Sequence, residues 1–283
     1  MSGKRRSGLT LLELIVLIVV AAMLLFLLIP WLLQSRQISA RRALCINNQH
    51  QLSTALLQYE AAREHFPGYV NRVELQEKGK YAVTSWVIPL LPHLERNDLW
   101  KQWTLGQQPK AYLHLLACPS DNISQTGVGI PMTDYVVNAG KSVGESTPAD
   151  GVCLDLNVDK PAVVSLHYIN QHDGAAYTLL LSENIQAGWY TDTDKADVGM
   201  TWSFDAGRTS LVNQGKDTAG DRPHDIRYAR PSSQHPGGVV ASFCDGHQQF
   251  ISQDIDYRVY EQLMTPDSKA AGIPGGFRPE EVK

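Results

Sequence analysis

A histidine and an aspartate at a fixed spacing are the first candidates for chemistry in this chain. His235 is followed by nine residues and then by Asp245-Gly246, and imidazole and carboxylate groups can bind metal ions or transfer protons. Asp-Gly between two alternating apolar runs also predicts a two-residue hairpin turn over 235–252, with Cys244 paired to His247. At about 3.3 Å per residue, a straight strand would hold His235 about 30 Å from Asp245. We therefore predict that Asp245 and Gly246 are turn residues and that the two ends of the motif do not share one metal ion.

The same register predicts a structural role for His235. It places the imidazole near Asp256, and we expect His235 to fix the Pro-Gly-Gly loop that follows it through Asp254 or Asp256. A ligand role for His235 is the alternative.

Three aspartates close together, Asp192, Asp194 and Asp197, are the candidates for a calcium site. Calcium prefers clustered oxygen ligands, but this segment lacks the glycine at the sixth position and the distal glutamate of an EF-hand loop. A solvated acidic loop is therefore the default interpretation. Calcium is the only cofactor that the sequence suggests, and no other is expected.

The four cysteines are Cys45, Cys118, Cys153 and Cys244. No pair has the Cys-x-x-Cys spacing of many zinc sites. If the bulk of the chain is exported, disulfides are favoured, with three connectivities open, and buried free thiols are the alternative.

Enzyme motifs find little support. Gly140-Lys141-Ser142-Val143-Gly144 matches a serine nucleophile pattern, but that turn must open into a helix and the residues that follow are typical of a loop. No phosphate-binding or dinucleotide-binding glycine pattern is present. The formal net charge of -4 lacks the excess of positive charge that is typical of nucleic-acid-binding proteins. We predict that the chain is not an enzyme and does not bind nucleic acid.

The N-terminus supplies the element that organises the molecule. Lys4, Arg5 and Arg6 precede Gly8, and an apolar stretch over 9–33 contains one charged residue, Glu13. A span of this length predicts a transmembrane helix, with the basic end in the cytoplasm and the head outside the cytoplasmic membrane. A carboxylate beside hydrocarbon usually has a dedicated partner.

This arrangement resembles the class III signal of type IV prepilins and type II secretion pseudopilins. The resemblance implies that residues 1–8 are a leader, that a prepilin peptidase cuts between Gly8 and Leu9, and that the new N-terminus is methylated. It also implies that Glu13 meets the N-terminus of a neighbouring pilin-like subunit. An uncleaved signal anchor is the alternative.

The chain is also similar to the prepilin-processing-associated H-X9-DG family, which has no known function and is abundant in planctomycetes. The match depends on the order of several short segments: Arg42-Ala43-Leu44-Cys45-Ile46-Asn47-Asn48, Phe66-Pro67-Gly68, Ser85-Trp86, Leu90-Leu91-Pro92-His93-Leu94-Glu95, Cys118-Pro119-Ser120-Asp121, Asp134-Tyr135-Val136, Ser182-Glu183-Asn184 and the His235 motif. Two cysteines coincide with recurring family positions, so the resemblance implies a disulfide between Cys45 and Cys118, leaving Cys153 with Cys244.

Periodicity predicts the elements of the remaining chain. Apolar residues at helical spacing continue over 34–63, which predicts one helix from Leu9 to Ala62. Short apolar runs over 64–265 predict strands, and 97–103 predicts a short helix. The predicted strands are 81–91, 133–138, 162–168, 177–182, 238–244 and 247–252. Residues 266–283 predict a flexible tail.

Together these features predict an α+β, type IV pilin-like fold, in which a long N-terminal transmembrane helix packs on an enlarged antiparallel β-sheet head. The predicted function is a prepilin-like structural subunit of a type IV pilus or type II secretion pseudopilus. An uncleaved, signal-anchored extracytoplasmic binding protein or adhesin is the alternative function.

Overall fold

The computed structural model of the chain describes residues 10–121, 132–204, 212–213 and 224–278, with residues 27–38 described as helix backbone only. It divides into two compact units, Met1–Arg41 and Arg42–Lys283. The predicted cleavage residues Gly8 and Leu9 lie outside the described residues.

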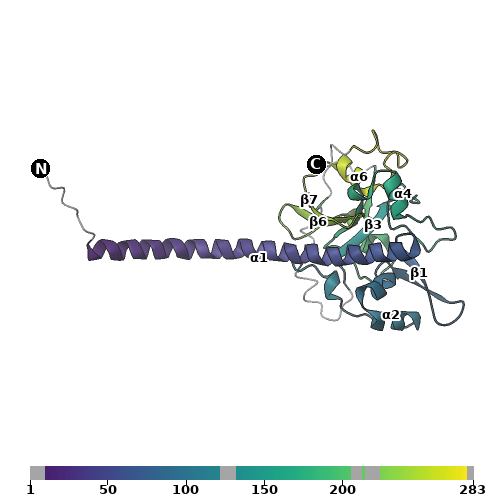
Figure 1. Cartoon of the computed structure of the whole chain (residues 1–283), viewed down its shortest axis with the longest axis horizontal. Coiled ribbons are helices and arrows are strands. Elements are labelled where there is room, and N and C mark those ends of the chain that lie inside the picture. Colours follow the sequence, from purple (N-terminus) through teal and green to yellow (C-terminus); the bar gives the residue numbers. More distant parts are fainter. Residues whose placement is uncertain (1–9, 122–131, 205–211, 214–223, 279–283) are drawn as a thin grey trace. The chain divides into compact units, whose positions relative to one another are not determined.

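A long helix, α1 (Leu11–Arg63), connects the two units, as the periodicity predicts (Figure 1). It ends where Glu64 adopts a left-handed backbone with φ 63°. Within the second unit, Cys45, Leu52 and Leu56 lie on its buried face. This spacing of seven and four residues gives the stripe that a helix buries against a core.

The second unit is built on a five-stranded sheet in the order β5-β3-β4-β6-β7, and a separate hairpin pairs β1 with β2. The strands are β1 (Val70–Glu74), β2 (Tyr81–Ser85), β3 (Tyr135–Lys141), β4 (Leu179–Glu183), β5 (Gly199–Trp202), β6 (Gly238–Phe243) and β7 (Gln248–Ser252). The other α-helices are α2 (Asn97–Thr104), α4 (Leu166–Gln171), α5 (Lys195–Val198) and α6 (Tyr257–Met264). Short 3-10 turns occupy η1 (Ile88–Leu94), η2 (His114–Leu116), η3 (Ala175–Tyr177) and η5 (Ile226–Tyr228).

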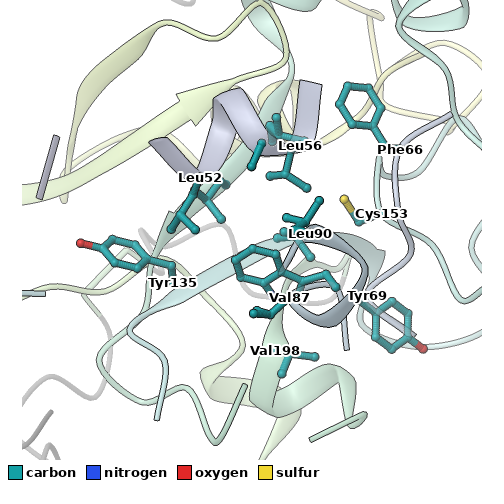
Figure 2. Close-up of a cluster of buried hydrophobic side chains, with 14 of the residues drawn as sticks. Leu52, Leu56, Phe66, Tyr69, Val87, Leu90, Tyr135, Cys153 and Val198 are labelled. Carbon is teal, nitrogen blue, oxygen red and sulfur yellow. The ribbon is translucent and has the colours of Figure 1, made fainter. Parts of the chain in front are cut away.

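The large sheet has a hydrophobic core on each face. Tyr135 and Val137 of β3 join the first core, which also holds Leu52 and Leu56 of α1 (Figure 2). Val136 points the other way, into a second core that contains the buried side of α6. Successive strand residues alternate between faces, so β3 contributes to both cores. The head therefore has three layers, with the sheet between α1 and α6.

The predicted fold class is wrong in two respects. The sheet is mixed, because β3 and β5 run parallel while the other pairs run antiparallel. Both edges of β4 are taken by β3 and β6, so β5 pairs with the remaining edge of β3. The predicted transmembrane helix is also overturned, since no described helix is long and apolar enough to cross a membrane.

The hairpin of β6 and β7 forms, but the predicted register is wrong by one residue. Val240 pairs with Phe250 and Ser242 with Gln248, where the prediction paired Phe243 with Gln248. The loop holds three residues, 244–246, and the Phe243 N–H donates to the His247 carbonyl at 3.0 Å. Three-residue hairpin loops with a glycine in the left-handed region are a common alternative to two-residue turns.

This shift of one residue moves a side chain to the other face of the sheet. Phe250 lies under the Arg42 guanidinium of α1, 3.6 Å from the ring centre, while Val239, Ala241 and Phe243 join the second core. The prediction had placed Phe250 with those three residues.

Other segments depart from the predicted pattern. Residues 162–168 form no strand: Ser165 caps α4 by accepting the Tyr168 N–H at 3.1 Å. The run over 81–91 stops as a strand at Ser85, because Pro89 and Pro92 favour the 3-10 turn η1. The sequence did not predict β1, β5 or α6.

The predicted flexible tail is packed over its described part. Ala271 and Ile273 belong to the second core, and the buried Ser268 donates its N–H to Asp173 at 2.7 Å. These contacts attach the chain after α6 to the head.

Candidate functional site

Four buried side chains meet inside the head, two of them cysteines that belong to the first core. Cys45, Cys118, Glu183 and His235, here called the Cys-Cys-Glu-His cluster, each direct one ligand atom to a common point, and these four atoms lie within 4.8 Å of one another. Their exposed fractions are between 0% and 2%. Among the described residues, this is the group of histidine, cysteine and acidic side chains that could hold a metal ion.

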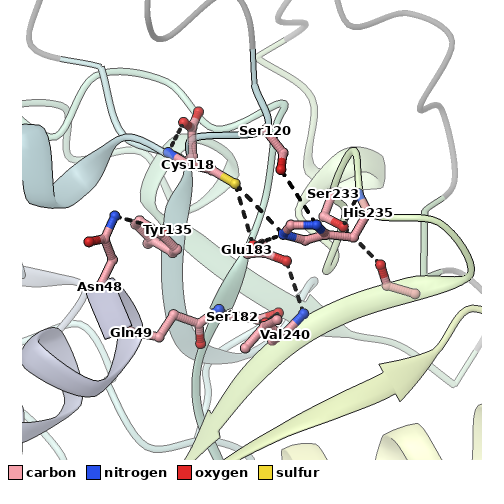
Figure 3. Close-up of polar contacts among 12 residues, drawn as sticks. Asn48, Gln49, Cys118, Ser120, Tyr135, Ser182, Glu183, Ser233, His235 and Val240 are labelled. Atoms are coloured by element: carbon pink, nitrogen blue, oxygen red, sulfur yellow. Dashed lines mark hydrogen bonds and ion pairs between the residues drawn. The ribbon is translucent and has the colours of Figure 1, made fainter. Parts of the chain in front are cut away.

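Each member comes from a different element. Cys45 lies on α1, Cys118 follows η2, Glu183 ends β4, and His235 precedes β6. Figure 3 shows the Cys118 sulfur and the His235 ring converging on the Glu183 carboxylate. The site therefore exists only when the helix, a loop and the sheet are assembled.

Short contacts link the members of the cluster. His235 Nε2 lies 3.1 Å from Glu183 Oε1, and the Cys118 thiol donates to the same oxygen at 3.5 Å. Cys118 Sγ lies 4.0 Å from His235 Nε2. The carboxylate is thus shared between the thiol and the imidazole.

Backbone groups and neighbouring polar side chains hold the ligands in place. Glu183 Oε2 accepts the Val240 N–H at 2.9 Å, and the Cys118 N–H donates to the Asp134 carboxylate at 2.6 Å. Ser120 Oγ lies 3.5 Å from His235 Nδ1. Outer contacts of this kind orient metal ligands in known sites.

Ser233 fixes the backbone that carries the histidine. Its hydroxyl accepts the His235 N–H at 3.0 Å and donates to the Gly238 carbonyl at 2.8 Å (Figure 3). This bridge closes the Pro-Gly-Gly loop. Ser233 therefore fixes this loop, a role that the sequence had predicted for Asp254 or Asp256.

The cluster changes the proton affinities of its members. Burial by itself lowers the pKa of His235, but hydrogen bonds to Cys118 and Glu183 raise it, to about 9. A hydrogen bond with Cys45, together with burial, raises the pKa of the Cys118 thiol far above its ordinary value. Both shifts favour the protonated forms of the His235 imidazole and the Cys118 thiol, which face the Glu183 carboxyl group.

The predicted partners of His235 are wrong. Asp256 caps α6 by accepting the Arg258 N–H, and the Asp254 N–H donates to Ser252. The partner is Glu183, which lies 52 positions earlier in the sequence and reaches His235 because β4 pairs with β6. The extrapolated strand register could not reveal a contact across the sheet.

The structure contains no disulfide between the predicted pairs. All four cysteines are buried free thiols. Cys45 and Cys118 nevertheless lie together in the cluster, as the family resemblance implied for their positions. Cys153 lies in the first core, outside the cluster, and Cys244 lies in the hairpin loop.

The three calcium candidates do not converge on one point. Asp192 accepts the Trp189 N–H at 3.0 Å, Asp194 caps α5, and Asp197 pairs with His224 at 2.6 Å. Each carboxylate thus has a separate local partner, and they are not part of the described group that could hold a metal.

The remaining predicted residues have local roles. Asp245 and Gly246 are confirmed as turn residues, and Gly246 has φ +91°. The chain bends after Lys141 and does not enter a helix, so Ser142 does not occupy a nucleophile elbow. At the other end, the Glu13 carboxylate accepts hydrogen bonds from the N–H and hydroxyl of Thr10 at 2.9 and 3.0 Å, and the N–H bond lowers its pKa.

Glu183 is the site residue that the sequence analysis did not assign. The signal is an acid that directly follows a run of three leucines and a serine in the strand Leu179-Leu180-Leu181-Ser182-Glu183, which is fully buried. A buried carboxylate must be paired or hydrogen-bonded, so its position predicts a partner but not which one.

Comparison with known proteins gives a family of unknown function. No curated protein and no solved structure matches the chain. The family model named SBP_bac_10 and described as "Protein of unknown function (DUF1559)" matches residues 34–258, a range that includes all four members of the cluster. The chain therefore belongs to the SBP_bac_10 family of proteins of unknown function (DUF1559).

Proposed function

We propose that this chain is a structural subunit of a pilin-like assembly, processed at its N-terminus by a prepilin peptidase. The observation that carries the proposal is the first part of α1. From Leu11 to Phe26 the large apolar side chains are between 49% and 77% exposed. An exposed apolar helix of this extent requires a partner, because apolar surface is stable when it is removed from water.

The proposed partner is the same helix of other pilin-like subunits. Glu13 is the only charged residue between Leu11 and Phe26, which leaves a surface suited to packing of helix against helix. In a single chain, the Glu13 carboxylate is held by Thr10. In the assembly, the amine released at Leu9 of a neighbouring chain would compensate its charge, and the head would lie outside the cytoplasm.

The test is the mature N-terminus of protein isolated from its native host. The proposal requires a terminal peptide that begins at N-methylated Leu9. A terminus upstream of Gly8 in assembled protein would refute it. That outcome would favour the uncleaved binding protein.

A pair of variants then separates assembly from helix capping. Glu13→Gln removes the charge, whereas Thr10→Ala removes the two hydrogen bonds of the Thr10 hydroxyl with Glu13 and leaves the charge and the backbone N–H bond in place. We expect Glu13→Gln to be cleaved but to form at least about tenfold fewer assemblies, because a partner charge is left unmatched. Thr10→Ala should assemble. Equal assembly of Glu13→Gln and wild type would contradict the role given to Glu13.

One feature favours the binding-protein alternative. A cavity of about 640 Å³ lies in the head, and its lining includes Tyr69, Glu145, Asp155 and Lys195. Lys195 lies beside the Tyr69 ring at 5.3 Å, and burial lowers its pKa. An aromatic ring with flanking charges suits a small polar ligand. A ligand retained by wild type but lost in Lys195→Met would support this function.

A further inference from the structure

We propose that the Cys-Cys-Glu-His cluster binds one zinc ion and joins α1 to the sheet of the head. The site is independent of the proposed function, because all four ligands lie within the unit Arg42–Lys283. Two sulfur ligands, one imidazole nitrogen and one carboxylate oxygen are all ligand types that zinc accepts.

The distances between ligand atoms fit a tetrahedral ion. With ordinary zinc bond lengths, a nitrogen and an oxygen ligand lie about 3.4 Å apart, and a sulfur lies about 3.6 Å from either. The corresponding distances here are 3.1 Å for His235 Nε2 to Glu183 Oε1, 3.5 Å for Cys118 Sγ to that oxygen, and 4.0 Å for Cys118 Sγ to the nitrogen. These three ligands need shifts of only a few tenths of an ångström, and the sulfur of Cys45, the fourth ligand, lies within 4.8 Å of the other ligand atoms.

Burial makes the site structural in character. All four ligands are buried and all four positions of a tetrahedral ion are filled by protein, which leaves none for water or substrate. The thiol ligands disfavour calcium and magnesium, which bind oxygen. A closed site of this kind holds elements together and catalyses nothing.

The binding step conserves charge through proton release. The thiols of Cys45 and Cys118 each lose a proton to solvent on binding the ion, and the protonated His235 ring loses the proton on Nε2, so one Zn²⁺ displaces three protons. Ser120, near Nδ1, and Val240, on Glu183 Oε2, then remain as outer contacts. No oxidant or reductant is needed.

A disulfide between Cys45 and Cys118 is the competing state of the same residues. It would bring the two sulfurs to about 2.05 Å and remove two ligands from the site. Zinc and the disulfide therefore exclude one another.

The experiment uses the full chain, purified without oxygen, stripped by a chelator and then titrated with Zn²⁺ or Co²⁺. We expect one zinc per chain after gel filtration. We also expect a cobalt spectrum with thiolate-to-metal charge transfer and the intense visible bands of a tetrahedral ion. Zinc at about a hundredfold excess over its dissociation constant should raise Tm by about 5–10 °C.

Two matched variants locate the site. Cys118→Ser removes a ligand, whereas Cys153→Ser makes the same chemical change at another buried thiol outside the cluster. We expect zinc affinity to fall at least about a hundredfold in Cys118→Ser and to stay within about threefold of wild type in Cys153→Ser. Glu183→Gln and His235→Gln should resemble Cys118→Ser.

Three results would overturn the proposal. The first is wild-type protein that shows no thiolate-to-cobalt charge transfer, a result that does not depend on any variant folding. The second is equal zinc binding by Cys118→Ser and Cys153→Ser. The third is a Cys45–Cys118 disulfide in protein taken from its native host.

Discussion

The two ends of β6 carry the same chemical pair in opposite surroundings. Before the strand, His235 meets Glu183 at 3.1 Å with exposed fractions of 2% and 0%. After it, His247 meets Asp245 at 2.6 Å with exposed fractions of 41% and 38%. The shorter contact, between His247 and Asp245, contributes less to stability, because water screens an exposed pair while a buried pair has few other partners.

The His-X9-Asp-Gly motif therefore has two separate roles. Its histidine enters a buried cluster that joins four elements, whereas its Asp-Gly forms the turn between β6 and β7. A third pair, His224 with Asp197, lies between these extremes in the burial of its carboxylate, which is 6% exposed, although its histidine is 67% exposed. The three pairs form a series in which burial is the main variable.

The largest effect is expected for the buried pair. Glu183→Gln removes the charge opposite His235 and weakens the acceptor of the Val240 N–H. In chelator-treated protein, we expect the free energy of unfolding to fall by about 3 kcal/mol, because an uncompensated charge is left in the core. Urea unfolding of wild type and of Glu183→Gln measures this difference in the free energy of unfolding. A loss below about 1 kcal/mol would show that burial does not govern the series.

The second-largest loss of stability is expected for Gly246 in the hairpin turn. Gly237 also has a positive φ and serves as the comparison. Gly246→Val forces a β-branched residue to φ +91° and directs its Cβ to within 3.1 Å of Leu57. Gly237 has φ +83° with open space around it. We expect losses of about 2–3 kcal/mol for Gly246→Val and about 1–2 kcal/mol for Gly237→Val. Urea unfolding measures both losses. Equal losses of unfolding free energy would mean that the Leu57 side chain moves away from the new Cβ without an energetic cost.

The intermediate pair should produce a pH dependence. A hydrogen bond and charge from Asp197 raise the pKa of His224 above 6.5, so its stabilisation is complete below pH 6.5 and is lost as pH rises through the raised value. Burial raises the pKa of Asp197 more than the hydrogen bond and charge of His224 lower it. The desolvation of this carboxylate therefore outweighs its attraction to His224.

The measurement compares wild type with His224→Gln from pH 6 to pH 8. We expect the wild-type advantage to shrink toward alkaline pH, by no more than about 0.5 kcal/mol because the histidine is mostly exposed. An advantage that grows with pH would show that the protonated form of His224 does not stabilise the fold.

The exposed pair should have the smallest effect. Asp245→Asn keeps the acceptor for the His247 N–H and removes only the charge. We expect the free energy of unfolding to change by less than about 0.5 kcal/mol. A loss as large as that of Glu183→Gln would remove the distinction between the two ends of β6.

The sequence was sufficient to predict the helices and strands that depend mainly on interactions between neighbouring residues. The helix over Leu11–Arg63, the short helix α2, and strands β3, β4, β6 and β7 all follow from apolar periodicity and from glycine and proline positions. Asp245-Gly246 identified a turn, because few residues other than glycine adopt a positive φ. The register failed by one residue, since two-residue and three-residue loops share the same sequence signal.

The sequence by itself singled out His235 and the four cysteines as candidate site residues, but it did not assign Glu183. Only the tertiary structure decided that Cys45, Cys118, Glu183 and His235 meet while Cys153 and Asp245 do not. Their positions span from 45 to 235, and the contacts arise where α1 crosses the face formed by β4 and β6. No local periodicity encodes such distances, because they depend on strand order and on which face each helix covers.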